Sequence, residues 1–445
     1  MAFSPILVML TNTGMKIVKS SQQITPYGGL TFVFQELEKK GIGKLVNNFL
    51  PDLPTQACYS WKDIFYSVWS IPLCGGDCIE DLNTNLRKYI KCIPFFNVPS
   101  ADSVLRRMKD LSRPTRKFVS QYSGKEHQFS IHMALNKLNI KLIKMLGGIK
   151  SKNIILDYDN TILKTDKVDA KKTYIKEKGY YPGVGIIEDQ IVYVENRNGN
   201  SDAQTYQERT ISRMFKILKT EGIKVDVFRA DSASYVLQVI ETVQRFVNRF
   251  YIRARNDQSV TNAIANIQNW EKAVLNNEEV WIGSITYKPF QRSRCLRIKK
   301  RLLSNYRLVV IKVPRKDGQL NFFTKEAFVY RSIITNDYEM SDIEVFKFYN
   351  QRGGKEREFD VMKNDFCWDN IPFSNLNENT VFLILTAMAR NIYSYLIRIF
   401  SYGNQVLKSN FRVKKFIFRF IIMPAKWTKR SRQIIFCIYN SLPET

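Results

Sequence analysis

The segment from residue 151 to residue 256 alternates short apolar runs with helical patterns, and this alternation constrains the fold more than any other feature. Apolar and β-branched residues predict five strands, of which 154–156 and 225–228 are expected to be buried. The expected strands are 154–156, 181–187, 191–194, 225–228 and 250–252, with a hairpin turn at Glu188-Asp189. Two expected helices lie before and after strand 225–228. This order predicts an α/β core.

The two helices are predicted from apolar residues that recur at helical spacing. The first is expected to be capped by Ser201-Asp202, and the second follows Asp231. Their buried faces are expected to hold, in turn, Ile211, Met214, Phe215 and Leu218, then Val236, Val239, Ile240, Val243 and Val247.

Three aspartates follow the expected buried strands. Asp157 and Asp159 come directly after residues 154–156, and Asp231 follows residues 225–228. Side chains at the carboxyl ends of such strands converge at one edge of the sheet. Buried carboxylates there need a compensating cation, and a pair of Mg²⁺ ions would supply it. The alternatives are strand-end capping for Asp157 and Asp159, and a helix N-cap for Asp231.

The net charge indicates the kind of partner. The 68 Lys and Arg residues against 41 Asp and Glu residues give a formal charge of +27. A soluble chain this basic usually binds a polyanion, most often nucleic acid, although a Lys-rich composition alone could also produce the charge. His127 and His132 are the two histidines, which argues against a Ser-His-Asp triad or a His-rich zinc site.

Cysteine usage and hydropathy predict the compartment. The seven cysteines are scattered without a disulfide framework, which fits a reducing cytoplasm. We expect no membrane helix, because no apolar run was found to approach the roughly 18 residues needed, the most apolar stretch being 381–389. Nothing near residues 6–10 resembles a signal peptide. We therefore expect a cytoplasmic protein with no membrane partner.

Residues 1–130 predict a mostly helical, basic region. Ser100 is a plausible N-cap of a helix whose apolar face would hold Val104, Leu105 and Met108. Arg106 and Arg107 would point elsewhere, so this helix could be the recognition helix of a helix-turn-helix. An ordinary solvated amphipathic helix fits the same pattern.

Two later regions are also basic. Residues 257–340 predict a β-rich insertion with strands 281–287, 308–313 and 328–334 and a hairpin turn at Asp317-Gly318. Ten Lys and Arg residues and no acidic residue lie between Gln291 and Lys316. Residues 403–438 hold nine Lys and Arg residues with interleaved aromatics. That mixture suits a surface that follows a DNA backbone, or a hairpin with a solvated basic face.

A polar stripe is expected between these two regions. On a continuous α-helix, Tyr349, Arg352, Glu356 and Lys363 would share a stripe about 60° wide. A stripe of mixed charge either faces solvent or lines a site. Gly353-Gly354 weakens the assumption of one continuous helix.

The order of these motifs resembles the DDE transposases of bacterial insertion sequences. The resemblance covers residues 151–400, and the spacing Tyr-x2-Arg-x3-Glu-x6-Lys matches that family's Y-R-E-K signature. Residues 156–161, Leu-Asp-Tyr-Asp-Asn-Thr, are similar to one branch, the thirteen-eighty group. The matching positions are Asp159, Thr161, Asp231, Tyr349, Arg352, Glu356, Lys363, the turn 197–200 and Asn391.

The resemblance implies an RNase H-like catalytic core interrupted by a β-rich insertion. In that fold the first and fourth strands are neighbours, which would bring Asp159 and Asp231 together, while Glu356 would come from a helix after the insertion. We therefore expect a DNA-end-binding region at 1–130, the core at 131–256 and 341–402, the insertion at 257–340 and a basic segment at 403–445.

The resemblance also implies a site and a reaction. Asp159, Asp231 and Glu356 would hold two Mg²⁺ ions, which Mn²⁺ could replace, with Asp157 as the alternative first ligand, since Asp157 and Asp159 face the same side of a strand. Tyr349, Arg352 and Lys363 would contact phosphates near the cleaved end. Trp281 is a candidate for stacking on a base, or a core residue.

The implied function is cut-and-paste DNA transposition. The expected partners are the terminal inverted repeats and the target DNA, with a homodimer in the DNA complex, near the bacterial nucleoid. Two alternatives stay open: a structure-specific nuclease on the same core, and a non-catalytic or domesticated DNA-binding protein. All three carboxylates are present, which argues against a decayed enzyme.

Overall fold

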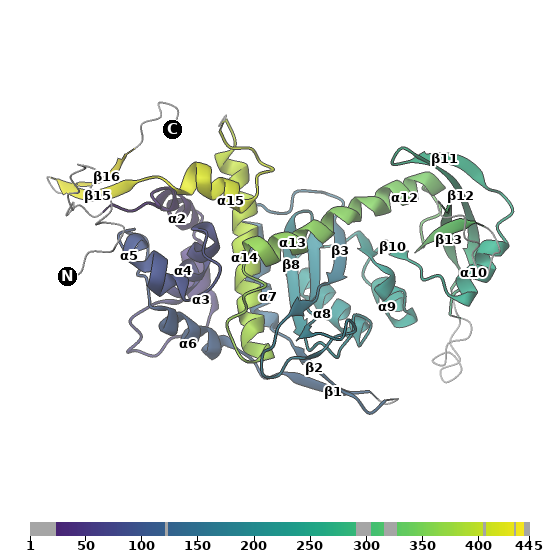
Figure 1. Cartoon of the computed structure of the whole chain (residues 1–445), viewed down its shortest axis with the longest axis horizontal. Coiled ribbons are helices and arrows are strands. Elements are labelled where there is room, and N and C mark those ends of the chain that lie inside the picture. The colour runs from purple at the N-terminus through teal and green to yellow at the C-terminus, as the bar shows by residue number, and fades with distance from the viewer. Residues whose placement is uncertain are drawn as a thin grey trace, which may run out of the picture.

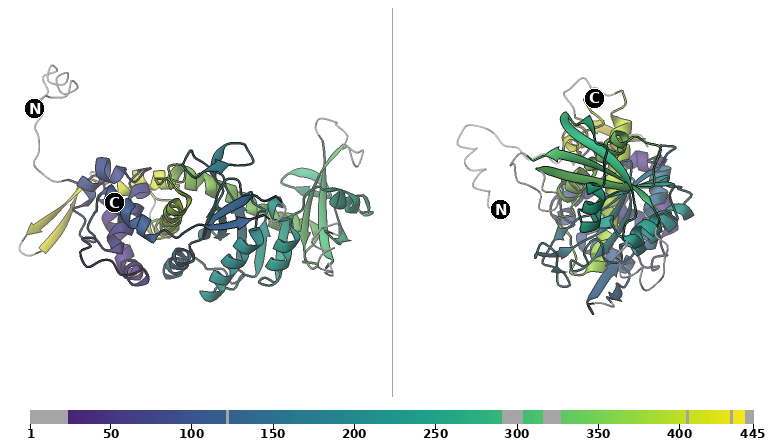
Figure 2. Two further views of the ribbon diagram at one scale, coloured as in Figure 1. Left: turned by 90° about the horizontal axis from the view of Figure 1, so that it is seen from below. Right: turned by 90° about the vertical axis from the view of Figure 1, so that its right-hand side faces the viewer.

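A computed structural model describes residues 24–120, 123–290, 304–315, 327–403, 406–430 and 433–439. The molecule is elongated (Figure 1). Helices near the N-terminus and a C-terminal hairpin form one end, a sheet with its covering helices forms the middle, and further strands form the other end. Figure 2 shows the hairpin projecting from the helical end.

One mixed sheet of eleven strands runs through the middle and the far end, in the order β1-β2-β8-β7-β3-β9-β10-β14-β13-β12-β11. Its central strands are in the sequence order third, second, first, fourth and fifth. β7 and β8 run antiparallel to their neighbours, and β3, β9 and β10 run parallel to one another. The five are β3 (Ile155–Asn160), β7 (Gly183–Ile187), β8 (Gln190–Arg197), β9 (Val227–Ala230) and β10 (Arg249–Arg253).

The five strands confirm the expected apolar runs with shifted ends. The largest shift is in β3, which continues to Asn160 and therefore contains Asp157 and Asp159 instead of ending before them. Antiparallel pairing with β7 over residues 156–160 holds these positions in the ladder. The two aspartates therefore lie on ordered backbone, which fixes their direction.

Helices cover both faces of the central strands. On one face α8 (Gln207–Thr220) and α9 (Leu237–Val243) pack with Leu156 and Tyr158 of β3. On the other face, Val345 and Phe346 of α12 (Asp342–Asn350) join a core cluster with residues of β9 to β14, and the ring of Phe348 lies 4.9 Å from that of Tyr251 on β10. Residues alternate between faces along a strand, so Asp157 and Asp159 lie on the α12 side.

The expected cap of the first helix was wrong. α8 begins at Gln207, after Tyr206 in a left-handed conformation with φ of 50°. Ser201 is instead buried in the preceding loop, where its hydroxyl oxygen lies 3.1 Å from Nδ1 of His127. Ser201, which was expected to cap the helix, therefore makes a tertiary contact instead.

The predicted β-rich insertion is an extension of the core sheet. β14 pairs antiparallel with β10, with Tyr251 opposite Thr335, and β13, β12 and β11 follow outward. The expected turn at Asp317-Gly318 and most of the basic run 291–316 lie outside the described residues. The elements are α10 (Gln258–Ala265), β11 (Glu271–Leu275), β12 (Glu278–Tyr287), β13 (Tyr306–Pro314) and β14 (Phe328–Thr335).

The N-terminal region is helical. Its helices are α2 (Gly29–Lys39), α3 (Ile42–Phe49), α4 (Trp61–Leu73), η1 (Leu82–Leu86), α5 (Arg87–Ile90) and α6 (Ala101–Leu111). Ser100 caps α6 as expected, accepting a hydrogen bond from the Ser103 backbone N–H at 3.3 Å. β1 (Arg116–Val119), β2 (Glu126–Ser130) and α7 (Met133–Met145) then lead to the central strands.

The helix α14 (Leu376–Phe400) lies between the N-terminal helices and the sheet (Figure 1). It shares a core with residues of α2, α4, α6 and β8. Among the described residues, it is the one helix whose length and composition would suit a membrane span, and its apolar window is wholly buried inside the protein. The apolar run is therefore longer than expected from the sequence, and its surroundings are those of a core helix.

The remaining elements are short. A helical path of α12, η3 (Gln351–Lys355) and α13 (Glu356–Asp365) crosses the sheet toward α14 (Figure 1). Thr25 pairs with Ala425, so the C-terminal segment folds back onto the N-terminal helices. The other elements are β4 (Leu163–Lys164), β5 (Lys171–Lys172), β6 (Lys178–Tyr180), η2 (Ser232–Ser234), α15 (Val413–Phe416), η4 (Ile417–Ile421), β15 (Ala425–Arg430) and β16 (Gln433–Ile438).

Candidate active site

Asp159 and Asp231 stand at equivalent positions on neighbouring parallel strands. The register of β3 and β9 runs from Ile155 opposite Val227 to Tyr158 opposite Ala230. One more residue in the same register puts Asp159 opposite Asp231. The carboxyl ends of the first and fourth strands of the central sheet thus bring together two carboxylates that are far apart in the sequence.

Burial and like charge act on Asp159 together. Its pKa is raised to about 6, chiefly because burial penalises the charged form, and repulsion by Asp231 adds to the increase. The guanidinium of Arg352 opposes this shift through an ion pair of 2.8 Å. A cation at this place would relieve the repulsion between the two carboxylates.

Both aspartates also make local hydrogen bonds. Oδ1 of Asp231 accepts from the Ala233 backbone N–H at 3.1 Å and caps η2, which was the alternative role expected for it. Oδ1 of Asp159 accepts from the Asn160 backbone N–H at 2.8 Å. These bonds orient the two carboxylates. Each bond uses only the Oδ1 oxygen of its aspartate.

Asp157 has a different environment. Both of its carboxylate oxygens accept from Arg229, at 2.8 and 2.9 Å, and both side chains are buried. Arg229 also donates to the backbone oxygen of Phe348 at 2.7 Å, which ties the strand pair to α12. This pairing gives Asp157 a structural partner and does not support it as a metal ligand.

Residues 349–363 do not form the one continuous helix on which the stripe depends, and the break suggested by Gly353-Gly354 is confirmed. α12 ends at Asn350, a 3₁₀ turn covers Gln351–Lys355, and α13 begins at Glu356. The paired glycines in that turn explain the break, because glycine disfavours the α-helix. The four polar residues therefore do not form one regular stripe.

Two of these four residues reach the aspartates. The Tyr349 hydroxyl donates to the backbone oxygen of Ala230, one residue before Asp231, at 3.1 Å. Burial raises the pKa of Tyr349 to about 12, so the phenol stays protonated. Arg352 pairs with Asp159 and lies near the backbone oxygen of Tyr158 at 3.4 Å.

The other two residues of the signature lie on α13. Glu356 begins this helix, and its side chain lies outside the described residues. Lys363 is half-buried two turns further along. Glu356 thus stands four positions after Arg352, at the first residue of α13.

The other candidate DNA-contacting residues lie on distant elements. Arg106 is exposed on α6, and Arg107 pairs with Asp110 at 2.8 Å on the same helix. Trp281 on β12 is half-buried, with its ring 5.6 Å from Phe328 and the Lys272 ammonium 5.7 Å from its ring. The structure thus does not bring these three residues to the aspartates.

Sequence reasoning missed the roles of Arg229 and Tyr181. Arg229 lies two residues before Asp231 on the same strand face, so its position in the Phe-Arg-Ala-Asp motif could have indicated a partner for Asp157. Tyr181 follows β6, and Asn160, the last residue of β3, donates to its backbone oxygen at 3.4 Å. Burial and repulsion by Asp231 and Asp159 raise the pKa of Tyr181. No local pattern in the sequence indicates that contact.

The residues present fit a divalent metal. Mg²⁺ and Mn²⁺ prefer oxygen ligands, and Asp159 and Asp231 supply carboxylates whose mutual repulsion a cation would reduce. Among the described residues, the compact group Asp77, Cys78 and Asp81 also has ligand atoms within 4.8 Å of one another. There the Asp81 carboxylate accepts hydrogen bonds from two backbone N–H groups and from the Asn85 side chain. These bonds give the carboxylate a structural role in the loop.

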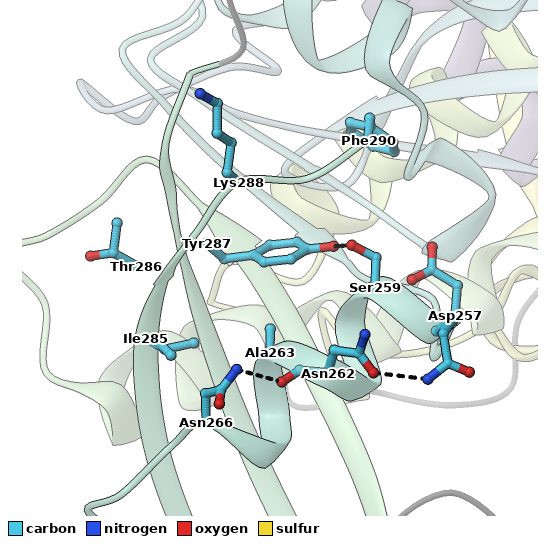
Figure 3. A pocket seen from close by; sticks show the side chains of 11 residues that line it. Asp257, Ser259, Asn262, Ala263, Asn266, Ile285, Thr286, Tyr287, Lys288 and Phe290 are labelled. Carbon is cyan, nitrogen blue, oxygen red and sulfur yellow. Dashed lines mark hydrogen bonds between the residues drawn. The ribbon is translucent and has the colours of Figure 1, made fainter. Parts of the chain in front are cut away.

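A pocket of about 640 Å³ lies between α10 and the end of β12 (Figure 3). Its wall carries Asn262 and Asn266, and the Tyr287 hydroxyl donates to Ser259 at 2.8 Å. The same hydroxyl lies 3.2 Å from that of Tyr235, which directly follows η2. The pocket is thus connected to the turn after Asp231 but is not lined by the carboxylates.

A sequence model of the family described as "Transposase DDE domain group 1" matches residues 9–445. The chain belongs to the DDE transposase family. Membership brings nuclease and transposition activity, and DDE transposases generally use divalent metal ions.

Further comparisons add little to this assignment. No curated protein matches the sequence of this DDE transposase family member. Among solved structures, it is similar to the cryo-EM structure of the piggyBac transposase in a synaptic complex with hairpin DNA. That similarity has 11% sequence identity and a TM-score of 0.42, over 88% of this chain and 79% of that one.

Proposed function

We propose that the chain is a DNA transposase that cuts at the ends of a mobile element and joins the freed ends to target DNA. Asp159, Asp231 and Glu356 are its catalytic carboxylates and hold two divalent ions, Mg²⁺ or Mn²⁺. The observation that carries the proposal is the β3–β9 register, which runs to Tyr158 opposite Ala230, the residues directly before Asp159 and Asp231.

We assign residues 131–256 and 341–402 to an RNase H-like core. The strand order third-second-first-fourth-fifth, with the second strand antiparallel to both the first and the third, supports the assignment. The helical region 1–130 is then the part that binds the element's ends, with Arg106 and Arg107 on α6 as candidate contacts. Its helices α2 to α6 lie together at one end of the molecule, which suits that role (Figure 1).

The residues around the carboxylates prepare the site for a phosphate. When bound, the two ions supply activation of the attacking oxygen and stabilisation of the leaving oxygen. Asp159 and Asp231 supply the oxygen ligands, and the Tyr349 ring is fixed between α12 and β9 by its bond to Ala230. Arg352 holds a planar cation beside Asp159, which suits a phosphate oxygen of the DNA.

The setting follows from the same proposal. A charge of +27 suits a protein that works on DNA, and we place it at the nucleoid of a bacterial cytoplasm. Lys363 on α13 and Trp281 on β12 are further candidate contacts for the cleaved end. A homodimer in the DNA complex and the Y-R-E-K insertion-sequence branch are part of the proposal.

The decisive experiment compares three conservative variants in a cleavage assay. Its substrate is a plasmid that carries the genomic DNA flanking this reading frame, with Mg²⁺ present. Asp159→Asn and Asp231→Asn should lower the cleavage rate about a thousandfold or more, because each removes an ion ligand. Asp189→Asn, an exposed residue of the β7–β8 turn, should leave the rate within about twofold.

Each outcome decides between functions. Near-normal cleavage by Asp159→Asn or Asp231→Asn would exclude the proposed site. A strand-transfer assay with a pre-cut end then separates a transposase from a nuclease on the same core, since a nuclease would cut but never join. If Asp231→Asn leaves every cellular role of the gene intact, the protein acts only by binding DNA.

A further inference from the structure

The connection between β3 and β7 forms a small sheet beside the two aspartates. Residues 161–182, here called the flap, hold β4, β5 and β6 in the order β4-β6-β5. The flap leaves the core directly after β3, which carries Asp159, and returns to it at β7. The proposed function gives this segment no task.

The base of the flap is fixed to the core. Tyr180 is fully buried and its hydroxyl donates to Asp169, whose second oxygen accepts from the Leu376 backbone N–H at 2.8 Å. The Lys171 backbone N–H donates to Asn198 at 2.8 Å. The flap is therefore a rigid projection whose position relative to α14 and β8 is set.

The outer part of the flap is basic and exposed. The segment holds six lysines and three acidic residues. Asp169 is used in the anchor described above, and Glu177 pairs with Lys164 at 2.7 Å. Lys172, Lys176 and Lys178 are exposed around the β5–β6 turn. The side that faces solvent thus carries an excess of positive charge.

Exposed apolar surface lies among these lysines. Tyr174 is 68% exposed and Val168 is 84% exposed, although large apolar side chains are usually covered. The ring of Tyr174 lies 5.9 Å from the ring of Tyr181. Backbone bonds hold Tyr181 and Pro182 against the end of β3, since Thr161 donates to the Pro182 oxygen at 3.2 Å. An aromatic path therefore leads from the exposed turn to the neighbourhood of Asp159.

We propose that the flap binds the DNA strand that passes over Asp159 and Asp231. The inference deepens the proposed function and rests on it. Lys172, Lys176 and Lys178 neutralise successive phosphates, and Tyr174 supplies a flat face on which a base can stack. Lysine charge and aromatic faces together are what single-stranded or unpaired DNA requires of a surface.

The test compares two triple variants with the same change of charge. Lys172→Gln, Lys176→Gln and Lys178→Gln remove the flap cations. Lys216→Gln, Lys219→Gln and Lys224→Gln remove three exposed cations on and after α8, on the opposite face of the sheet. The probe is a fluorescein-labelled DNA of mixed sequence, as a duplex and as a single strand, in a titration of the full chain over a series of salt concentrations.

The flap triple variant should bind DNA roughly tenfold to a hundredfold more weakly, and the slope of log Kd against log salt should fall by about two to three. The α8 triple variant should change Kd less than about threefold, since its cations lie away from the aspartates. Tyr174→Ala should weaken binding of the single strand by about tenfold or more and that of the duplex less.

Equal effects of the two triple variants would overturn the proposal, as would an unchanged salt slope of the flap variant. Hydrogen exchange on the unmodified chain provides a second test that no folding defect can obscure. DNA should slow exchange at residues 171–178, and unchanged exchange there would overturn the inference. If the flap triple variant binds and cleaves DNA as well as the unmodified chain does, the inference alone fails. If it neither binds nor cleaves DNA, the proposed function fails.

Discussion

At the scale of single residues, two aspartates on one strand face have opposite environments. Both carboxylate oxygens of Asp157 accept hydrogen bonds from Arg229. Asp159 forms an ion pair with Arg352 through one oxygen and is repelled by the nearby Asp231. The period-two alternation of a strand predicts that both point to the same side and cannot separate them. What separates them is the residue opposite each one on β9, which depends on strand pairing and is absent from local sequence patterns.

The first prediction concerns pH. The cleavage rate should increase as pH rises through about 6, because the raised pKa of Asp159 keeps it protonated below that value. The midpoint should move to lower pH as the metal concentration is raised, since metal binding releases the proton. A rate that falls with pH, or a midpoint independent of metal, would contradict this.

The raised pKa of Asp159 also makes the free energy of unfolding depend on pH. The pKa of Asp159 is raised from 3.8 to about 6, so the unfolded chain ionises before the folded one. The contribution of this group is therefore present below about pH 4 and is lost as pH rises to about 6. Asp159 thus lowers stability at neutral pH, as is common for groups placed for function.

A second prediction tests the buried ion pair. Arg229→Gln should lower the free energy of unfolding by about 3–5 kcal/mol, because it leaves the Asp157 carboxylate buried without its guanidinium. Arg107→Gln breaks a helix-surface pair on α6 and should cost less than about 1 kcal/mol. Urea unfolding measures both, and similar losses would show that the Asp157–Arg229 pair has no special structural role.

At the scale of elements, the ends of helices and strands were the hardest to predict. The apolar faces of α8 and α9 are buried as expected, because periodicity is a local property. The start of α8 was misplaced because Ser201 bonds to His127, far away in the sequence. The glycines in η3 divide the helix on which the stripe of Tyr349, Arg352, Glu356 and Lys363 depended. Instead, tertiary contacts bring Arg352 to Asp159 and Tyr349 to the backbone of Ala230.

The turn at residues 197–200 allows a prediction for the flap base. A Cβ at Gly199 would lie 2.3 Å from the Lys171 backbone oxygen and 2.5 Å from that of Gly179. Gly199→Ala should therefore displace β5 and β6, cost about 1–3 kcal/mol and speed hydrogen exchange at residues 171–180. Gly353→Ala, where a Cβ meets open space, should change stability by less than about 1 kcal/mol. Unchanged exchange in the flap of Gly199→Ala would refute this packing.

At the scale of the whole molecule, α14 joins two parts that the sequence presents as separate regions. It packs against the N-terminal helices on one side and β8 on the other, so one core contains residues from Leu30 to Ile421. The sequence indicated an α/β core and a β-rich region but not their fusion into one sheet. The pairing of β14 with β10 is non-local, and apolar alternation carries no information about which strand is the neighbour.

Asn391 provides the prediction at this scale. Its side chain bonds the backbone N–H and oxygen of Ile191 on β8 and the side chain of Asn139 on α7, each at 2.9 Å. Asn391→Ala should lower the free energy of unfolding by about 2–3 kcal/mol, because a buried N–H loses its acceptor. Asn377 lies on the same helix as Asn391 and its side chain makes a long bond, of 3.4 Å, to Ser112 at the end of α6, so Asn377→Ala should cost less than about 1 kcal/mol. Calorimetry distinguishes the two, and equal melting temperatures would contradict the role given to Asn391.

The antiparallel ladder between β10 and β14 has a mechanical consequence. Because Tyr251, Ile252 and Arg253 are paired with residues 333–335, the outer strands cannot rotate about a linker relative to β3 and β9. Any DNA gripped at that far end would stand at a set separation from the scissile phosphate. The fixed length of the sheet would then determine how far along the duplex the cut is made from the bound site.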